Sequence, residues 1–214
     1  MPQALLCGSL RGFRADVRAL REHFDQVVAK RTGILYHDHD ADYVGWAVTS
    51  RTGEIVDGVR RISEEDVRGQ HIPSSAVHET EICNGPLKAT MTKLQSLGIV
   101  PFRARIMALA AAHDRMKFHR DAKRECWRLH VPLATTPECF FEWKKEGGAV
   151  VRKHLPADGR AWLVRVDVQH RAVNRTVGEG VRIHLLMSLA RVPRPSMFGG
   201  DLILSESGAP SVAA

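Results

Sequence analysis

Residues 181–189 read VRIHLLMSL, a mostly apolar run whose length is typical of a β-strand. Because side chains alternate between the two faces of a strand, Arg182, His184 and Leu186 share one face. Three earlier runs have the same strand-like character: FRARIMAL (102–109), CWRLHVPL (126–133) and AWLVRVDV (161–168). Connections rich in Gly, Asp or Pro separate these runs, so together they predict several antiparallel strands.

The N-terminal half has the periodicity of helices instead. Residues 10–31 carry apolar side chains at helical spacing, from Leu10 to Val28, with charges on the opposite face, and we expect a helix there. PLKATMTKLQSLG, residues 86–98, predicts a second helix that ends near its glycine. Helices followed by antiparallel strands indicate a mainly β fold in which N-terminal helices pack on a small β-sandwich or barrel.

The remaining stretches are weakly patterned. Residues 32–80 favour loops and short strands and suggest a lid or cap. The final stretch SESGAPSVAA, residues 205–214, is small and polar, and we expect it to be disordered. The resulting division is N-terminal helices and cap over 1–100, a catalytic core over 101–195 and a C-terminal tail over 196–214.

The composition fits one soluble domain of 214 residues. Hydrophobic residues make up 44% and charged residues 26%, which excludes a disordered chain. The N-terminus does not have the pattern of a signal peptide, and no apolar run approaches the ~20 residues that span a bilayer. We therefore expect a cytoplasmic protein with no membrane partner. The four cysteines form no CxxC pair, so reduced thiols are favoured over a zinc site or disulfides.

The net charge of +7 is compatible with an acidic partner: a nucleic acid, an acidic peptide or an anionic cosubstrate. The lysines and arginines are scattered, and no nucleic-acid-binding motif accompanies them. A basic surface without a specific partner is the plainer interpretation, and a nucleic acid is the less favoured partner.

Residues that can hold a metal begin at His119. His119 and Asp121 form an H-x-D pair, and on an extended segment both side chains point to the same side. His170, expected in a loop just after residues 161–168, supplies a third group. Two imidazoles and one carboxylate on one face of an octahedral metal leave three positions open, which is typical of Fe(II) oxygenases that take a 2-oxoacid and O₂. A second His-Asp run at 37–40 has no matching distal pattern, and we interpret it as a solvated turn.

Two further strands carry basic residues among apolar neighbours. Arg182 could grip the far carboxylate of a dicarboxylate cosubstrate, because its planar guanidinium holds a carboxylate through two parallel hydrogen bonds. Arg128 and His130 share a face in the run at 126–133. Facing inward, they need an anion or another partner. The alternative makes Arg128 a surface residue of an edge strand and His130 a core histidine with its hydrogen bonds made.

Several residues remain open between structural and functional roles. Trp162 alternates with valines and is expected in the core, while Arg165 and Asp167 on the opposite face could pair. Asn174 could brace the segment around His170 or form a turn. Trp46, Asn84 and the 70–85 segment could form part of a substrate pocket, but nothing in their spacing requires that role.

From about residue 103 to 189, the chain resembles the aspartyl/asparaginyl β-hydroxylase family of Fe(II)/2-oxoglutarate-dependent dioxygenases. This family includes bacterial hydroxylases of free amino acids such as the proline cis-4-hydroxylases. The resemblance covers roughly 40% of the chain. Its carrying residues are His119-x-Asp121, Arg128-Leu-His130-Val-Pro-Leu133, Gly159-Arg-Ala-Trp162, His170 with Asn174, and Arg182-Ile-His-Leu185.

The resemblance implies a double-stranded β-helix, the cupin-like jelly roll of two facing antiparallel sheets. It implies Fe(II) bound by His119, Asp121 and His170, and 2-oxoglutarate bound at its distal carboxylate by Arg182. It also implies that Arg128 and His130 line the pocket for the cosubstrate or for the substrate's carboxylate.

The function implied by the resemblance is hydroxylation of an amino acid, free or within a small peptide, with 2-oxoglutarate and O₂ consumed and succinate and CO₂ released. Two other classes remain open. One is a cupin-like binding protein without turnover, which would have no need for open metal positions. The other is a nucleic-acid-associated protein, suggested by charge alone.

Overall fold

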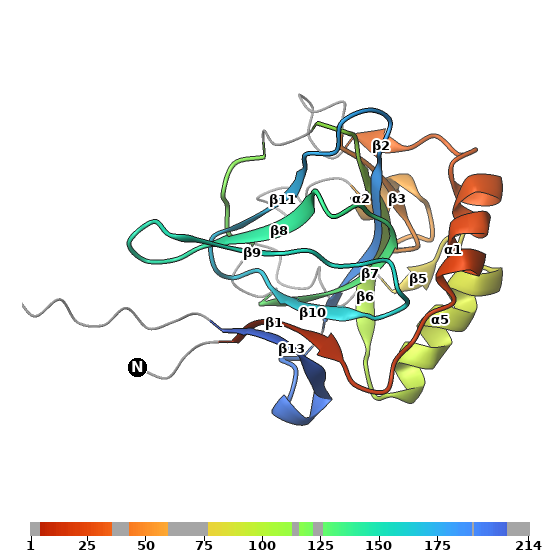
Figure 1. Ribbon diagram of the computed structural model, residues 1–214. Coiled ribbons are helices and arrows are strands. Elements are labelled where there is room, and N and C mark those ends of the chain that lie inside the picture. Colours follow the sequence, from red (N-terminus) through yellow and green to blue (C-terminus); the bar gives the residue numbers. More distant parts are fainter. Residues whose placement is uncertain are drawn as a thin grey trace, which may run out of the picture.

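The computed structural model describes residues 5–35, 43–59, 77–112, 116–121, 126–189 and 191–204. Its main feature is an eight-stranded antiparallel sheet (Figure 1). In spatial order its strands are β13 (Phe198–Leu204), β1 (Leu5–Leu10), β10 (Trp162–Arg165), β7 (Trp127–Ala134), β12 (Arg182–Leu189), β6 (Pro101–Leu109), β3 (Tyr43–Ala47) and β2 (Ile34–Leu35). The four strands expected from the sequence are therefore all present, and they are neighbours in the middle of this sheet.

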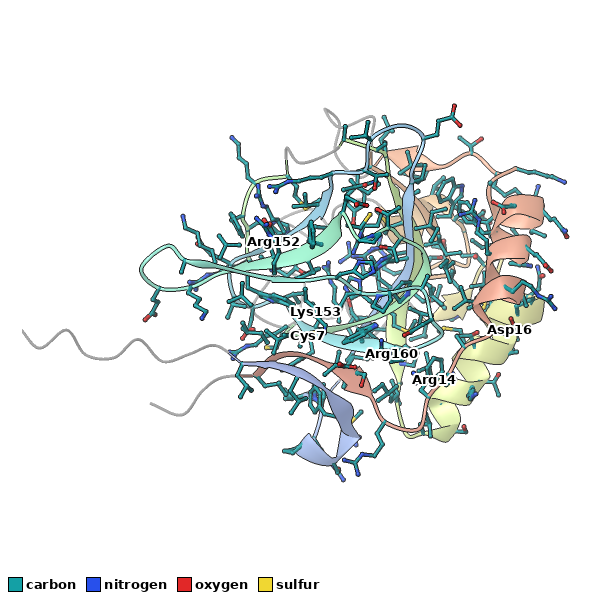
Figure 2. The ribbon with its side chains drawn as sticks, viewed as in Figure 1. Cys7, Arg14, Asp16, Arg152, Lys153 and Arg160 are labelled. Carbon is teal, nitrogen blue, oxygen red and sulfur yellow. The ribbon has the colours of Figure 1, made fainter. Side chains whose placement is uncertain are left out.

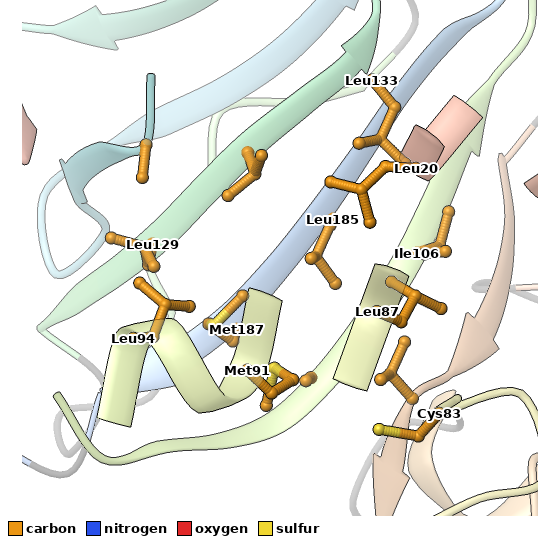
Figure 3. Close-up of a cluster of buried hydrophobic side chains, with 14 of the residues drawn as sticks. Leu20, Cys83, Leu87, Met91, Leu94, Ile106, Leu129, Leu133, Leu185 and Met187 are labelled. Atoms are coloured by element: carbon orange, nitrogen blue, oxygen red, sulfur yellow. The ribbon is translucent and has the colours of Figure 1, made fainter. Parts of the chain in front are cut away.

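Helices cover one face of the main sheet. They are α1 (Val17–His23), which continues as a π-helical turn (Phe24–Val28), and α5 (Gly85–Ser96). Figure 3 shows Leu20 of α1 and Leu87, Met91 and Leu94 of α5 packed against strand residues of β6, β7 and β12. The strand residues facing the helices are Ile106, Leu129, Val131, Leu133, Leu185 and Met187. Period-two alternation leaves the intervening polar residues of the same strands on the opposite face.

A second sheet covers that opposite face. It has three antiparallel strands, in the order β11 (His170–Asn174), β8 (Cys139–Lys144) and β9 (Val150–Lys153). Phe141 and Trp143 of β8 pack with Trp162 and Val164 of β10 in a buried apolar cluster. Two facing antiparallel sheets with helices outside are consistent with the expected jelly roll. Trp162 is fully buried, as expected for a core residue.

The rim of this apolar cluster is cationic. Lys153 Nζ lies 5.1 Å and Arg160 Cζ 4.8 Å from the centroid of the Trp162 ring, so both cations contact the indole (Figure 2). The Cys7 thiol in β1 is buried, and this burial raises its pKa to about 12, although the charge of Lys153 opposes the effect. None of the four cysteines, which all lie within the described residues, forms a disulfide.

The first predicted helix was wrong at its N-terminal end. Residues 5–10 form β1, an interior strand of the main sheet, and the helix begins only at Val17. Gly12 adopts a φ of 72°, which ends the extended conformation, and the Asp16 carboxylate caps the helix by accepting a hydrogen bond from Ala19 N. The second helix was predicted correctly, since α5 covers Gly85–Ser96 and is followed by Gly98 at φ 74°.

The weakly patterned regions are only partly described. Residues 43–47 form β3 of the main sheet, and β4 (Thr49–Ser50) pairs with β5 (His78–Glu79) in a small separate sheet. These parts of the expected lid are strands, and a short helix α2 (Val56–Val59) lies between β4 and β5 in the chain. The 37–40 run and the 205–214 stretch lie outside the described residues.

At the C-terminus, β13 follows a short 3-10 turn (Pro195–Met197) and pairs with β1. The segment assigned to a tail from residue 196 therefore contributes an edge strand through Leu204. Within the described part of the chain, no helix is long and apolar enough to cross a membrane.

Candidate metal centre

A short extended segment, residues 116–121, lies beside the start of β11 and is called the ligand segment below. His119 N–H donates to His170 O at 3.0 Å, and His170 N–H donates to His119 O at 2.9 Å. Asp121 N–H donates to Val166 O at 2.9 Å. This pairing brings the H-x-D motif against His170, which begins a strand instead of lying in the expected loop.

The three side chains converge on one point. Their ligand atoms all lie within 4.8 Å of one another. His119 Nε2 is 3.7 Å from Asp121 Oδ1, and His170 Nε2 is 3.9 Å from Asp121 Oδ2. Separations of this size suit atoms that share one metal ion, because ligand atoms about 2.0–2.2 Å from a metal lie roughly 3–4 Å apart. The structure thus brings together the three residues that the sequence grouped.

Backbone carbonyls orient both imidazoles. His119 Nδ1 lies 3.0 Å from Lys117 O, and His170 Nδ1 lies 2.9 Å from Val168 O. A carbonyl only accepts, so Nδ1 carries the hydrogen on each ring and donates it. Nε2 is then the atom with the lone pair, and on both rings it faces Asp121. Metal-binding histidines are commonly held by such a second hydrogen bond.

The two imidazoles differ in exposure. His170 is 3% exposed, and its ring stacks on Phe141 with centroids 5.2 Å apart and an interplanar angle of 9°. Burial lowers the pKa of His170 to about 4, although Asp121 opposes this effect. The ring is therefore neutral at neutral pH, which is the form that binds a metal. The side chain of His119 is 44% exposed, so it lies at the rim of the site.

Arg128 contacts the carboxylate of the candidate metal centre. Its Nη2 is 2.7 Å from Asp121 Oδ2, and both side chains are about 90% buried. A guanidinium at this distance fixes the position of the carboxylate. The structure thus gives Arg128 a contact with the carboxylate proposed as a ligand, which the sequence had not indicated.

Arg182, His184 and His130 lie between the two sheets, on adjacent strands. Arg182 is 2% exposed, and its Nη2 donates to His184 Nδ1 at 3.1 Å. Within the described residues it has no carboxylate in salt-bridge range. Burial lowers the pKa of Arg182 below its ordinary value. A buried guanidinium with only a neutral acceptor is costly unless a ligand supplies an anion.

The two histidines beside Arg182 add polar atoms that have no protein partner. His130 Nδ1 lies 3.4 Å from His184 Nδ1. The Nε2 atoms of both rings are buried, and neither has a hydrogen-bond partner among the described residues. Burial, and then the charges of nearby arginines with Arg182 foremost, lower the pKa of His130 well below its ordinary value. The interior thus holds neutral rings with hydrogen-bonding atoms available to a ligand.

Phe141 connects the two groups of residues. Its ring stacks on His170 and also meets His130, with centroids 5.7 Å apart. The sequence did not single out Phe141, because an aromatic residue in a strand gives no local sign of which imidazole it will contact. Arg105 was missed too, although its alternation with Met107 and Leu109 in 102–109 could have placed it on the inner face.

Other expected residues have structural roles. Asn174 is fully buried and braces the end of β11, because its Nδ2 donates to the carbonyls of Leu109, Ala110 and Gly180. Arg165 and Asp167 pair at 2.7 Å, as expected. Trp46 packs edge-on against Phe24 in the helix-side core, and its Nε1 donates to Arg31 O. Asn84 precedes α5 as its N-cap.

The donor set fits ferrous iron. Two imidazole nitrogens and one carboxylate, with the rest of the coordination sphere left to other ligands, are the donors that non-haem iron oxygenases use. The interior beside them also offers a buried cation and unpartnered ring nitrogens, which fit an anionic cosubstrate. These are properties of the chain's own residues and do not depend on a relative.

No known family model and no curated protein sequence matches the chain. Among solved structures, it is similar to an oxidoreductase of the 2OG-Fe(II) oxygenase family from Burkholderia pseudomallei, at 13% identity and a TM-score of 0.45, over 79% of this chain and 76% of that one. It is also similar to EvdMO1, at 13% identity and a TM-score of 0.46, over 87% of this chain and 48% of that one. The chain spans about half the length of EvdMO1. Both likenesses are distant, so the functional argument rests on the chain's own site.

Proposed function

We propose that this chain is a non-haem Fe(II)- and 2-oxoglutarate-dependent dioxygenase that hydroxylates an amino acid, free or within a small peptide. The observation that carries the proposal is the convergence of His119, Asp121 and His170, with both imidazoles presenting Nε2 to one point. Iron in such a site, with 2-oxoglutarate and O₂, supplies the oxidising power for hydroxylation of an unactivated C–H, with succinate and CO₂ as coproducts.

The protein's residues hold and orient the reactants. Lys117 O and Val168 O fix the imidazole rings, and Arg128 fixes the ligand carboxylate. All three side chains come from two adjacent extended segments, so they would hold a metal ion from one side and leave the other side to cosubstrate, substrate and O₂. Phe141 covers His170 and keeps water from that ring.

Arg182 is the residue proposed to bind the distal carboxylate of 2-oxoglutarate. His184 accepts from Arg182 at Nδ1, so its Nε2 carries a hydrogen and is a donor facing the interior. An anion between the sheets would therefore meet one guanidinium and one neutral N–H donor. Charge-assisted hydrogen bonds of this kind are about twice as strong as neutral ones.

The substrate class rests on the resemblance of the 103–189 region to amino acid hydroxylases. An amino acid or peptide carboxylate is compatible with the basic residues between the sheets, which include Arg105 as well as Arg128 and Arg182. Residues that contact the substrate would determine which amino acid is bound and which of its carbons is hydroxylated.

The test is anaerobic binding of Fe(II) and 2-oxoglutarate, followed by visible spectroscopy and calorimetry. Wild type should show a weak metal-to-ligand charge-transfer band when both are present. His119→Ala should lose metal binding, whereas Arg182→Gln should keep metal binding and lose the band at moderate 2-oxoglutarate concentration. His78→Ala, which removes an exposed histidine of β5, is the matched control.

Wild type that binds neither iron nor 2-oxoglutarate would overturn the proposal and favour a binding protein without turnover. Iron binding that survives His119→Ala would place the metal elsewhere. With the band established, succinate release in the presence of each common amino acid identifies the substrate class. Succinate formation that no amino acid or short peptide stimulates would reject the amino acid part of the proposal.

A further inference from the structure

We propose that Arg171 is a positioning residue that holds the ligand segment against the small sheet and thereby sets the geometry of His119. This inference rests on the proposed metal centre and extends it beyond the three ligands. Arg171 follows His170 in β11, so the two side chains point to opposite faces of the strand. His170 faces the metal centre from the inside, and Arg171 acts from the outer face.

Glu142 anchors Arg171 on that outer face. Arg171 Nε donates to Glu142 Oε2 at 2.8 Å, and Arg152 Nε donates to Glu142 Oε1 at 2.7 Å. The three residues are direct neighbours across β11, β8 and β9. The Glu142 side chain is fully buried, so its charge requires these guanidiniums. Arg152, labelled in Figure 2, is 48% exposed, and Arg171 is 20% exposed.

Arg171 also contacts the ligand segment at two points before His119. Its Cζ lies 4.6 Å from the centroid of the Phe118 ring, and its Nη1 donates to Met116 O at 3.5 Å. Next to it, Ala172 N–H points at Met116 Sδ at 3.4 Å. The segment is therefore fixed on β11 just upstream of the first ligand.

The contacts lie on either side of the carbonyl that orients His119. Lys117 O accepts the hydrogen on His119 Nδ1, and Lys117 stands between Met116 and Phe118. His119 itself is at the exposed rim, where its ring contacts the ring of His170 with centroids 4.5 Å apart. Holding Met116 and Phe118 holds Lys117 O in place, which keeps Nε2 of His119 directed at Asp121. Arg171 thus acts through another residue and does not touch the metal.

Arg152 provides a matched control. It makes the same kind of ion pair with Glu142, and its Cζ lies 5.3 Å from the centroid of the Phe140 ring. The two arginines differ in the ring that each contacts: Arg152 lies over Phe140 of β8, whereas Arg171 lies over Phe118 of the ligand segment. Comparing Arg171→Gln with Arg152→Gln therefore separates the loss of a Glu142 pair from the loss of support for His119.

The experiment is titration of each metal-free protein with Mn(II), a redox-stable probe, with free Mn(II) measured by EPR. Arg171→Gln should weaken Mn(II) binding about 10-fold or more, the size of effect expected when a group supporting a metal ligand is removed. Arg152→Gln should change it less than about 2-fold, because Arg171 then keeps its pair with Glu142 and its contacts with the ligand segment. Arg171→Lys, which keeps the charge without the planar group, should lie between them.

Equal Mn(II) affinities for Arg171→Gln and Arg152→Gln, whether both reduced or both unchanged, would overturn the positioning role while leaving the metal centre intact. Wild type that binds Mn(II) no better than His119→Ala would overturn the metal centre and this inference with it. Should Arg171→Gln fail to fold, Phe118→Leu removes the ring beneath Arg171 and keeps the Glu142 pair. Phe118→Leu should also weaken Mn(II) binding several-fold, and unchanged binding there would refute the proposal.

Discussion

Replacing Arg182 by methionine removes a positive charge from between the two sheets and keeps an unbranched side chain of similar length. Arg182 is 2% exposed in the wild type, and among the described residues its guanidinium donates a hydrogen bond to His184 Nδ1. Within the described residues, no carboxylate lies within salt-bridge range of it. The substitution therefore removes a buried charge that is neutralised only when an anion binds.

Two opposing terms set the expected change in the free energy of unfolding. Burying an ion costs several kcal/mol after relaxation, and one hydrogen bond from a charged group returns about 1.5–3 kcal/mol. Methionine avoids the net cost but leaves His184 Nδ1 with a weaker partner, which costs about 1 kcal/mol. We expect Arg182→Met without ligands to be between unchanged and about 2 kcal/mol more stable than wild type.

With ligands present, the order of stabilities should reverse. At 2-oxoglutarate and Mn(II) concentrations about 100-fold above the dissociation constants, wild type should gain about 2.7 kcal/mol or more, and the variant should gain only the part due to the metal. Urea unfolding of both proteins, with and without 2-oxoglutarate at fixed Mn(II), measures this difference. A variant that is more than 2 kcal/mol less stable without ligands, or that gains as much from 2-oxoglutarate as wild type, would refute the reasoning.

Three other predictions concern stability and reactivity. Asn174→Ala should lower the free energy of unfolding by about 1–3 kcal/mol, because it removes the donor shared by the buried Leu109 carbonyl and the part-buried carbonyls of Ala110 and Gly180. A loss below about 1 kcal/mol in urea unfolding contradicts the bracing role. Leu185→Ala in the helix-side core should cost about 2–5 kcal/mol in the same assay, and a smaller loss would mean that the cavity collapses. Burial raises the pKa of Cys7 to about 12 and that of Cys83 to about 11. Iodoacetamide at about pH 8 should therefore modify the half-buried Cys126 first, which mass spectrometry can verify. Rapid labelling of Cys7 in the native protein would contradict its burial.

Features that depend only on residues close together in the sequence could be predicted from the sequence alone. Alternation in the runs at 126–133 and 181–189 predicted that Arg128 shares a face with His130 and Arg182 with His184, because the two faces of a strand are defined by the pleat itself. That Arg128 lies inside the protein and not at a surface edge was decided by the structure. The helix at Gly85–Ser96 was predicted because its boundaries are local signals. The H-x-D pair is also local, since an extended backbone alone directs both side chains to one side.

Contacts between distant segments were decided only by the tertiary structure. The predicted helix began at residue 10 because Leu10 and Phe13 fit helical spacing, but Leu10 ends β1, which pairs with β10 and β13, and α1 begins only at Val17. The same holds for the partner of Arg128, which is Asp121, and for the stack of Phe141 on His170. Local periodicity specifies which face a side chain occupies. Which residue it meets there depends on sheet order and register, and these are set by the packing of the whole chain.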